Sequence, residues 1–203
     1  MKYNPQIHHR RSIRLKDYDY SQPGVYFVTI CTNDRQCWFG EIHDSQMCLN
    51  QLGKIVAQGW LRTPEIRPEV ILDEWTIMPN HLHGIIIITH QPTPPNNHVG
   101  AHRRAPSQCA PNQCVPNQPQ FRRKSKSLAS IIAGFKSSTT KRINQVRATP
   151  RVPLWERNYY ESIVRNTEHL EHVRNYIWAN PYRWKDDPEY SSSTLINSFD
   201  LPF

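Results

Sequence analysis

Two histidines, His81 and His83, lie two residues apart at the start of an apolar run that continues to residue 88. Side chains alternate across a strand, so an extended chain projects both imidazoles from one face, where they can bind one metal ion together. The alternative is that both histidines only form hydrogen bonds at the start of a buried strand. The pair by itself does not separate these two interpretations.

A second segment with chemical capacity covers residues 168–181 (EHLEHVRNYIWANP). Its apolar residues recur with helical spacing, and Pro181 predicts the end of the helix. Tyr176 and Asn180 are four residues apart and therefore lie one above the other on a single face. If this face packs beside the histidine strand, a phenol oxygen and an amide oxygen approach the same metal. The alternative is a tyrosine at the rim of the core and an asparagine that caps the helix.

A tyrosine beside a metal suggests nucleophilic chemistry on a phosphate. An unperturbed tyrosine has a pKa of about 10, so it is a poor nucleophile at neutral pH unless a cation or a base favours its ionised form. A divalent metal supplies such a cation and polarises the phosphate oxygens. Two imidazoles and one amide oxygen leave positions open for phosphate and water. Mg²⁺ or Mn²⁺ is therefore the expected cofactor, and Zn²⁺ stays open as an alternative.

Other tyrosines compete for the role of nucleophile. The rivals are Tyr159, Tyr160 and Tyr182. Four residues after the first two come aliphatic side chains, and four residues after the third comes Asp186, past the helix break that Pro181 predicts. None of the three has a helix-borne partner like Asn180. Tyr176 is therefore the expected nucleophile.

The motifs also occur in a recognisable order. The segments 78–83 (MPNHLH), 154–160 (LWERNYY) and 175–181 (NYIWANP) make the chain resemble the REP-associated tyrosine transposases across roughly residues 24–90 and 125–190. That family lies within the wider group of single-tyrosine transposases with a histidine-hydrophobic-histidine motif. The resemblance implies that His81 and His83 bind the metal, that Tyr176 is the nucleophile and that Asn180 is a third metal ligand.

The activity that the resemblance implies is cleavage and rejoining of single-stranded or hairpin DNA. The tyrosine attacks a phosphodiester, forms a 5'-phosphotyrosine and frees a 3'-hydroxyl that can later reverse the step. Two alternatives stay open: a non-catalytic nucleic-acid-binding protein that uses a basic surface, and a metal-dependent phosphodiester hydrolase that activates water and needs no tyrosine. Related transposases include monomers and dimers, so monomer and homodimer are both expected possibilities.

Basic residues indicate the same class of partner. The chain carries 25 Lys and Arg against 17 Asp and Glu, and no acidic residue occurs between Glu74 and Glu156. A long span of one sign repels itself unless a polyanion screens it. The alternative is a basic surface that water alone solvates. The residues expected to contact DNA are Arg10, Arg11, Arg14, Arg122, Arg123, Lys124, Lys126, Lys136, Lys141 and Arg142.

The predicted elements follow the order strand, helix, strand pair, helix, helix. Strands are expected at residues 25–30, 70–77 and 81–89, and helices at 52–61 and over the amphipathic stretch 128–143, before the tyrosine helix. This order indicates an α+β fold with an antiparallel sheet backed by helices. The resemblance narrows the expected fold to a ferredoxin-like core.

A chain of 203 residues is long enough for one catalytic domain, expected at residues 23–190. A basic segment, 1–22, precedes it and a tail, 191–203, follows it. Residues 91–124 hold a proline-rich near-repeat and are expected to form a disordered basic loop. No apolar stretch is long enough to span a bilayer, so no membrane partner is expected. The five cysteines form no C-x-x-C motif, and their odd number favours a reducing cytoplasm.

Neutralising Arg122, Arg123 and Lys124 together is expected to flatten the salt dependence of DNA binding. Each cation that contacts a phosphate releases counterions, so the slope of log affinity against log salt falls by about 0.7 for each lost contact with a single strand. Fluorescence anisotropy across a salt titration measures the slope. A salt-independent affinity in the unaltered protein would contradict the electrostatic interpretation.

Overall fold

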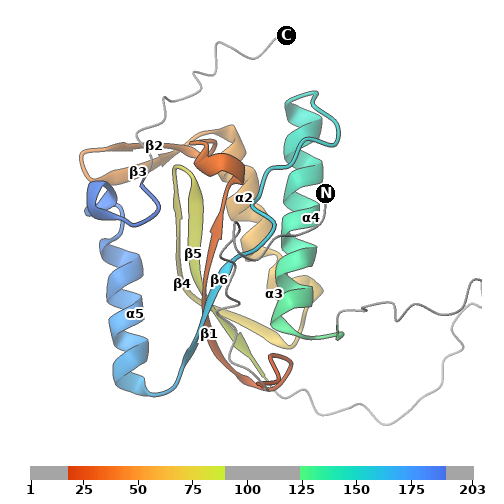
Figure 1. The fold of residues 1–203 in the computed structure, drawn as a ribbon, viewed down its shortest axis with the longest axis vertical. Coiled ribbons are helices and arrows are strands. Elements are labelled where there is room, and N and C mark those ends of the chain that lie inside the picture. Colours follow the sequence, from red (N-terminus) through yellow and green to blue (C-terminus); the bar gives the residue numbers. More distant parts are fainter. Residues whose placement is uncertain (1–17, 90–123, 191–203) are drawn as a thin grey trace, which may run out of the picture.

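The centre of the molecule is a four-stranded antiparallel sheet with the strand order β4-β5-β1-β6 (Figure 1). The structure is a computed structural model that describes residues 18–89 and 124–190. The strands are β1 (Gly24–Cys31), β4 (Val70–Met78), β5 (His81–Ile88) and β6 (Tyr160–Val164). The strand order and the antiparallel pairing confirm the expected α+β fold with a ferredoxin-like sheet.

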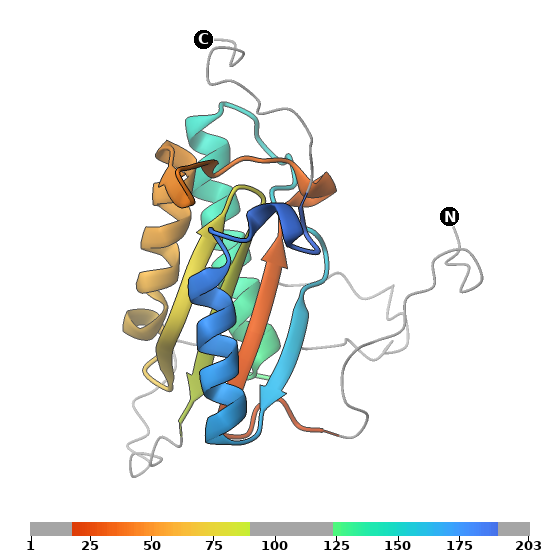
Figure 2. The ribbon, with the colours of Figure 1, turned by 90° about the vertical axis from the view of Figure 1, so that its left-hand side faces the viewer.

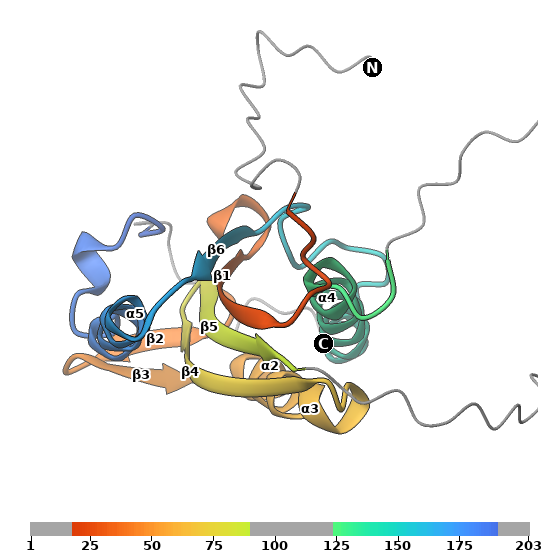
Figure 3. The ribbon, with the colours of Figure 1, turned by 90° about the horizontal axis from the view of Figure 1, so that it is seen from below.

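Helices cover both faces of this sheet. Helix α2 (Gln51–Leu61) connects β1 to β4, and helix α4 (Leu128–Val146) precedes β6; both lie on one face. Helix α5 (Thr167–Ala179) lies on the opposite face, as Figure 3 shows. The short helix α3 (Thr63–Ile66) follows α2. The sheet therefore separates α5 from the pair formed by α2 and α4.

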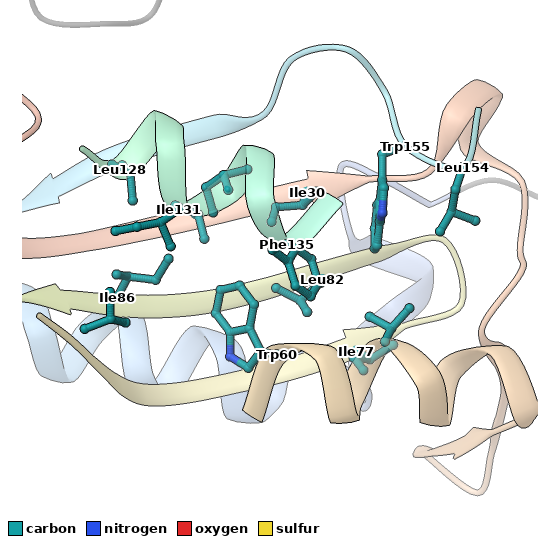
Figure 4. Close-up of a cluster of buried hydrophobic side chains, with 14 of the residues drawn as sticks. Ile30, Trp60, Ile77, Leu82, Ile86, Leu128, Ile131, Phe135, Leu154 and Trp155 are labelled. Carbon is teal, nitrogen blue, oxygen red and sulfur yellow. The ribbon is translucent and has the colours of Figure 1, made fainter. Parts of the chain in front are cut away.

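The larger hydrophobic core fills the space between the sheet and the α2/α4 pair (Figure 4). Trp60 of α2 is fully buried and meets Phe135 of α4 edge to face, with ring centroids 5.2 Å apart. Trp155 packs against the same phenyl ring at 5.6 Å. Aromatic side chains bury large apolar areas, so this cluster joins both helices to the sheet.

Alternation along β5 decides which side chains face α5. Leu82 and Ile86 belong to the larger core, whereas Ile85 belongs to a smaller cluster under α5. Because successive side chains point to opposite faces, His81 and His83 share the face of Ile85. The cluster under α5 includes Phe27, Ile85, Val164, Val173 and Ile177. The histidines therefore lie on the face that α5 covers.

Polar contacts fix the position of α5 on that face. The side chain of Asn166 accepts a hydrogen bond from the His169 N–H at 2.7 Å and so caps the start of the helix. Arg174 donates to both carboxylate oxygens of Asp73 on β4, at 2.8 and 2.6 Å. This bidentate pair adds direction as well as energy. Helix α5 is thus held at its start and near its middle.

The predicted order of elements is wrong in two places. It omits the hairpin of β2 (Gly40–His43) and β3 (Gln46–Leu49), and it omits β6. Strand β6 is short and carries Glu161 and Ser162 in its centre, so its apolar pattern is weak. The other predicted strands and helices are confirmed, with ends that differ by a few residues. The expected loop at 91–124 except its last residue, residues 1–17 of the expected basic segment 1–22, and the tail 191–203 lie outside the described residues.

The described residues bear on two expectations from the sequence, those on membrane-spanning segments and on the cysteines. No helix at 18–89 or 124–190 is long and apolar enough to cross a membrane. Cys31, Cys37 and Cys48 are free thiols. Burial is the main reason that the pKa of Cys37 is raised.

Replacing Gly84 with alanine is expected to lower the free energy of unfolding by about 1–3 kcal/mol. A Cβ at Gly84 would lie 2.5 Å from Cζ2 of the buried Trp60, so the indole must shift. The control is Gly134→Ala in α4, where the nearest atom would be 3.9 Å away. That change should raise stability by about 0.5–1 kcal/mol. Urea unfolding measures both, and equal effects would contradict the packing of Trp60 on β5.

Candidate metal and nucleophile site

The two histidines of the motif lie at the N-terminal end of β5. His81 pairs in register with Cys31, and His83 pairs with Thr29, both on β1. The two imidazole Nε2 atoms are 2.9 Å apart, and both side chains are buried. The structure therefore brings these nitrogens together on one face, as the alternation of the strand requires.

Asn80 determines which nitrogen of His81 is free. Its Nδ2 donates to two backbone carbonyls, those of Arg35 at 3.2 Å and Glu189 at 2.8 Å. These bonds orient its Oδ1 as the acceptor for Nδ1–H of His81, at 2.8 Å. In the neutral ring, the Nε2 lone pair of His81 is then available to a metal, because a hydrogen bond at one nitrogen sets the tautomer at the other.

A similar contact supports the second imidazole. The hydroxyl of Thr29 lies 2.8 Å from Nδ1 of His83, across the β1–β5 ladder. The Phe27 ring stacks on the same imidazole, with centroids 5.5 Å apart. Both Nδ1 atoms are thus occupied, and both Nε2 atoms point into the space between them and α5.

Helix α5 adds Tyr176 and Asn180 to this space, as their spacing predicts. The Tyr176 hydroxyl lies 3.3 Å from Nε2 of His83. Asn180 is buried, and its Oδ1 has no hydrogen-bond partner within the described parts of the chain. A buried amide oxygen without a partner is costly. This oxygen is therefore a position at which a cation would be stabilising.

Asp187 is the residue of the site that sequence reasoning missed. It follows the short 3₁₀ helix η2 (Trp184–Asp186), which lies over the end of β1 in Figure 2. Its Oδ2 accepts hydrogen bonds from the Tyr176 hydroxyl at 3.2 Å and from Asn180 Nδ2 at 2.6 Å, and lies 3.6 Å from Nε2 of His83. The signal available in the sequence was a carboxylate shortly after the Tyr176 helix.

The segment that carries Asp187 is fixed from several directions. The backbone N–H of Glu189 donates to Asp187 Oδ1 at 2.7 Å, and the Glu189 carboxylate pairs with Arg35 at 2.6 Å. The indole of Trp184 lies against the His81 ring, with centroids 5.8 Å apart. The carboxylate of Asp187 is therefore held in the site and is not a mobile surface group.

The electrostatics of the site favour a bound cation. Burial, followed by the charge of neighbouring His83, lowers the pKa of His81 well below its usual range. Burial and the Asp187 carboxylate raise the pKa of Tyr176. Burial also opposes ionisation of Asp187, but the His83 imidazole 3.6 Å away and the hydrogen bond from Asn180 outweigh it and hold the pKa of Asp187 below its usual range.

The donor set fits a divalent metal ion. One ligand atom each from His81, His83 and Asp187 lies within 4.8 Å of the other two, and all three side chains are buried. Two imidazole nitrogens and a carboxylate oxygen suit divalent ions, and the unpartnered oxygen of Asn180 adds a fourth donor nearby. The group can therefore bind a metal beside the Tyr176 hydroxyl.

The rival tyrosines are placed elsewhere. Tyr159 packs against the larger core, under the ammonium group of Lys136 at 5.4 Å from its ring centroid. Tyr160 is 44% exposed on the edge strand β6, and Tyr182 is 78% exposed. Tyr176 is the tyrosine whose hydroxyl contacts His83 and Asp187.

Of the cations expected to contact DNA, those of α4 and Lys124 are described with their contacts. Lys136, Lys141 and Arg142 belong to α4, on the face of the sheet opposite α5. Lys124 pairs with Asp19 at 2.6 Å, and Arg142 donates to Gln58 at 2.8 Å. The residues outside the described ranges are Arg10, Arg11, Arg14, Arg122 and Arg123.

Comparisons with known proteins find a sequence relative and solved structures with a similar fold. No family model matches the chain. The chain is 42% identical over 190 residues to a protein of Haemophilus influenzae described as uncharacterized. The aligned residues make up 93% of this chain and 97% of the Haemophilus influenzae protein. The fold is similar to that of a REP-associated tyrosine transposase bound to a REP hairpin, with a TM-score of 0.51, 16% identity and coverage of 88% of this chain and 81% of that one.

Replacing Asp187 with asparagine is expected to weaken Mn²⁺ binding by at least about 10-fold, because even outer partners of a metal ligand contribute that much. The side chain keeps its shape but loses its charge. Asp186→Asn is the matched control, since Asp186 is the exposed neighbour. Calorimetric titration with Mn²⁺ measures both variants. Unchanged affinity in Asp187→Asn, or equal losses in both, would remove Asp187 from the metal site.

Proposed function

We propose that this chain, which belongs to the same family as the uncharacterized Haemophilus influenzae protein, is a metal-dependent enzyme that cleaves and rejoins single-stranded DNA through a phosphotyrosine, as a transposase of the REP-associated type. The observation that carries the proposal is the position of the Tyr176 hydroxyl, 3.3 Å from His83 and 3.2 Å from Asp187, inside a buried His-His-Asp group. The ferredoxin-like fold shared with a REP-associated transposase supports it.

Tyr176 is the nucleophile in this proposal. Its oxygen forms a bond to the phosphorus of a phosphodiester, the bond from phosphorus to the 3' oxygen breaks, and the leaving end takes up a proton as a 3'-hydroxyl. Tyr176 is 37% exposed, so a DNA strand can reach it, and in this proposal its phenol proton leaves to water. The covalent link keeps the free energy of the broken bond, so the step is reversible.

The other residues prepare this tyrosine. The hydrogen bond to Asp187 and the edge-to-face contact with Phe27, whose ring centroid lies 6.0 Å away, orient the phenol. The low pKa of Asp187 makes it a weak base, so orientation and not proton abstraction is its role toward Tyr176. Ionisation of the phenol therefore depends on a positive charge beside it.

His81, His83 and Asp187 would hold that charge as Mg²⁺ or Mn²⁺, with the Asn180 oxygen as a further ligand. When bound, the ion stabilises the phenolate and polarises the phosphate oxygens. Asn80 and Thr29 keep the imidazoles in the orientation that presents Nε2. The placement of a tyrosine hydroxyl within the group favours this chemistry over a water-activating hydrolase.

The proposed partner is single-stranded or hairpin DNA, bound by residues 23–190 as one catalytic domain with the help of the basic segments. The protein acts as a monomer or a homodimer. The expected compartment is the cytoplasm, since the substrate is cellular DNA and the described cysteines are free thiols.

Tyr176→Phe is expected to abolish the covalent DNA adduct while metal and DNA binding persist. The change removes one oxygen and keeps the ring that contacts Phe27. Labelled hairpin DNA incubated with protein and Mg²⁺, then run on a denaturing gel, detects the adduct. Tyr160→Phe, an exposed tyrosine on β6, is the control and should form the adduct normally.

Two outcomes would contradict the proposal. Undiminished adduct from Tyr176→Phe would assign the nucleophile to another tyrosine. Tight DNA binding without any adduct in the unaltered protein would favour a non-catalytic binding protein.

A further inference from the structure

A cavity of about 710 Å³ lies between the C-terminal half of α4 and the segment 148–157 that leads toward β6. Pro150, Pro153, Leu154 and Trp155 supply apolar walls, and Lys141, Arg151 and Arg157 are exposed cations on its lining. Glu156 is the acidic residue of the lining. Because α4 and α5 cover opposite faces of the sheet, this cavity is separate from the His-His-Asp group.

The backbone nevertheless connects the cavity to the metal and nucleophile site. The N–H of Glu156 donates to the carbonyl of Cys31 at 2.9 Å, and Trp155 forms a β-bridge with Thr32. Cys31 in turn pairs in register with His81. Figure 4 shows Trp155 and Leu154 at the end of the sheet where Leu82 and Ile77 lie. Two strand spacings, about 10 Å, thus separate the cavity wall from the backbone of His81.

We propose that this cavity binds one unpaired nucleotide of the DNA strand, a few nucleotides away from the phosphodiester that lies at Tyr176. The inference rests on the proposed function and names how the substrate strand is held beside the reacting phosphate. A distance of about 10 Å is one that a few nucleotides of single-stranded DNA span. The strand would pass over the end of the sheet, from the α4 face to the α5 face.

The chemistry of the lining matches a nucleotide in two respects. The prolines and the Trp155 edge give an apolar surface for the face of a base, and sequence-tolerant contacts of this kind are typical of single-strand binding. Lys141, Arg151 and Arg157 complement the charge of the phosphates. The volume lies within the range of pockets that enclose small ligands.

A polar residue of the lining can read the edge of the base. Glu156 carries a carboxylate whose oxygens are acceptors. Exocyclic amino groups of adenine, cytosine and guanine are donors that suit such oxygens.

Lys136 has a structural part in this cavity. Its ammonium group donates to the carbonyls of Glu156 at 2.9 Å and Asn158 at 2.8 Å. Burial lowers its pKa to about 8. Lys136 therefore supports the cavity wall from inside.

The test combines an abasic scan with a variant that fills the cavity. Ser137 is an exposed residue of α4 that lines the cavity, and Ser137→Phe places a ring in it. Ser138→Phe, at the adjacent exposed position outside the lining, is the matched control. The probe is a fluorescein-labelled REP hairpin with single-stranded flanks of about ten nucleotides, a length in the range of single-strand binding sites. Anisotropy is measured without divalent metal.

In the unaltered protein, one abasic position in a flank should lower the affinity by about 10-fold, as loss of one base contact does. Ser137→Phe should remove the penalty at that position alone, and Ser138→Phe should keep it. If the effects of the abasic position and of Ser137→Phe are not additive, the base at that position contacts the cavity. A flat scan, or a penalty that both variants retain, would overturn the proposal.

The proposed function is judged separately, by adduct formation with Tyr176 at saturating DNA. If the adduct forms but the abasic scan is flat, the nucleotide-binding cavity is contradicted and the proposed enzymatic function is supported. If one coupled position is found but no adduct forms, the enzymatic function is contradicted and a DNA-binding cavity is supported. Binding of free deoxynucleoside monophosphate that Ser137→Phe abolishes, with no coupled position in the DNA, would assign the cavity to a small molecule and overturn the inference.

Discussion

Two imidazole rings buried side by side can stay neutral or share a cation, and the rest of the site depends on this constraint. The Nε2 atoms of His81 and His83 face each other at 2.9 Å because the Nδ1 atoms are already engaged by Asn80 and Thr29. Burial works against protonating His81 and lowers its pKa. A carboxylate at Asp187 completes the arrangement, and a cation between the three groups would balance its charge.

The two faces of the sheet carry different groups of residues, which come close together at one end of the sheet. The face under α5 carries the proposed metal ligands and the phenol, beside a small hydrophobic cluster. The opposite face carries most of the core, where Trp60, Phe135 and Trp155 lock α2 and α4 in place. The sheet between the two faces holds these side chains in fixed positions, as the proposed phosphoryl transfer requires. The end where β5 begins is where segments from both faces meet.

Much of this arrangement could be predicted from the sequence, for physical reasons that differ between elements. The histidine spacing and the apolar run fix a strand and a shared face, and the Tyr176–Asn180 spacing fixes a helical face. The role of Asp187 in the site was not predicted, because Asp187 follows a 3₁₀ helix, where no periodicity predicts the direction of a side chain. Only tertiary contacts bury it. Strand β6 was not predicted for a related reason. Its central residues are polar, and its pairing with β1 is non-local.

The central claim is that His81, His83 and Asp187 hold one divalent ion against Tyr176. Anomalous diffraction from a crystal soaked in Mn²⁺ tests it most directly, because it locates the ion without reference to activity. The account predicts a single strong peak at coordination distance, roughly 2.0–2.2 Å, from both Nε2 atoms and from an Asp187 oxygen, next to the Tyr176 hydroxyl. A crystal in which Mn²⁺ binds elsewhere, while the two imidazoles keep their mutual hydrogen bond, would contradict it.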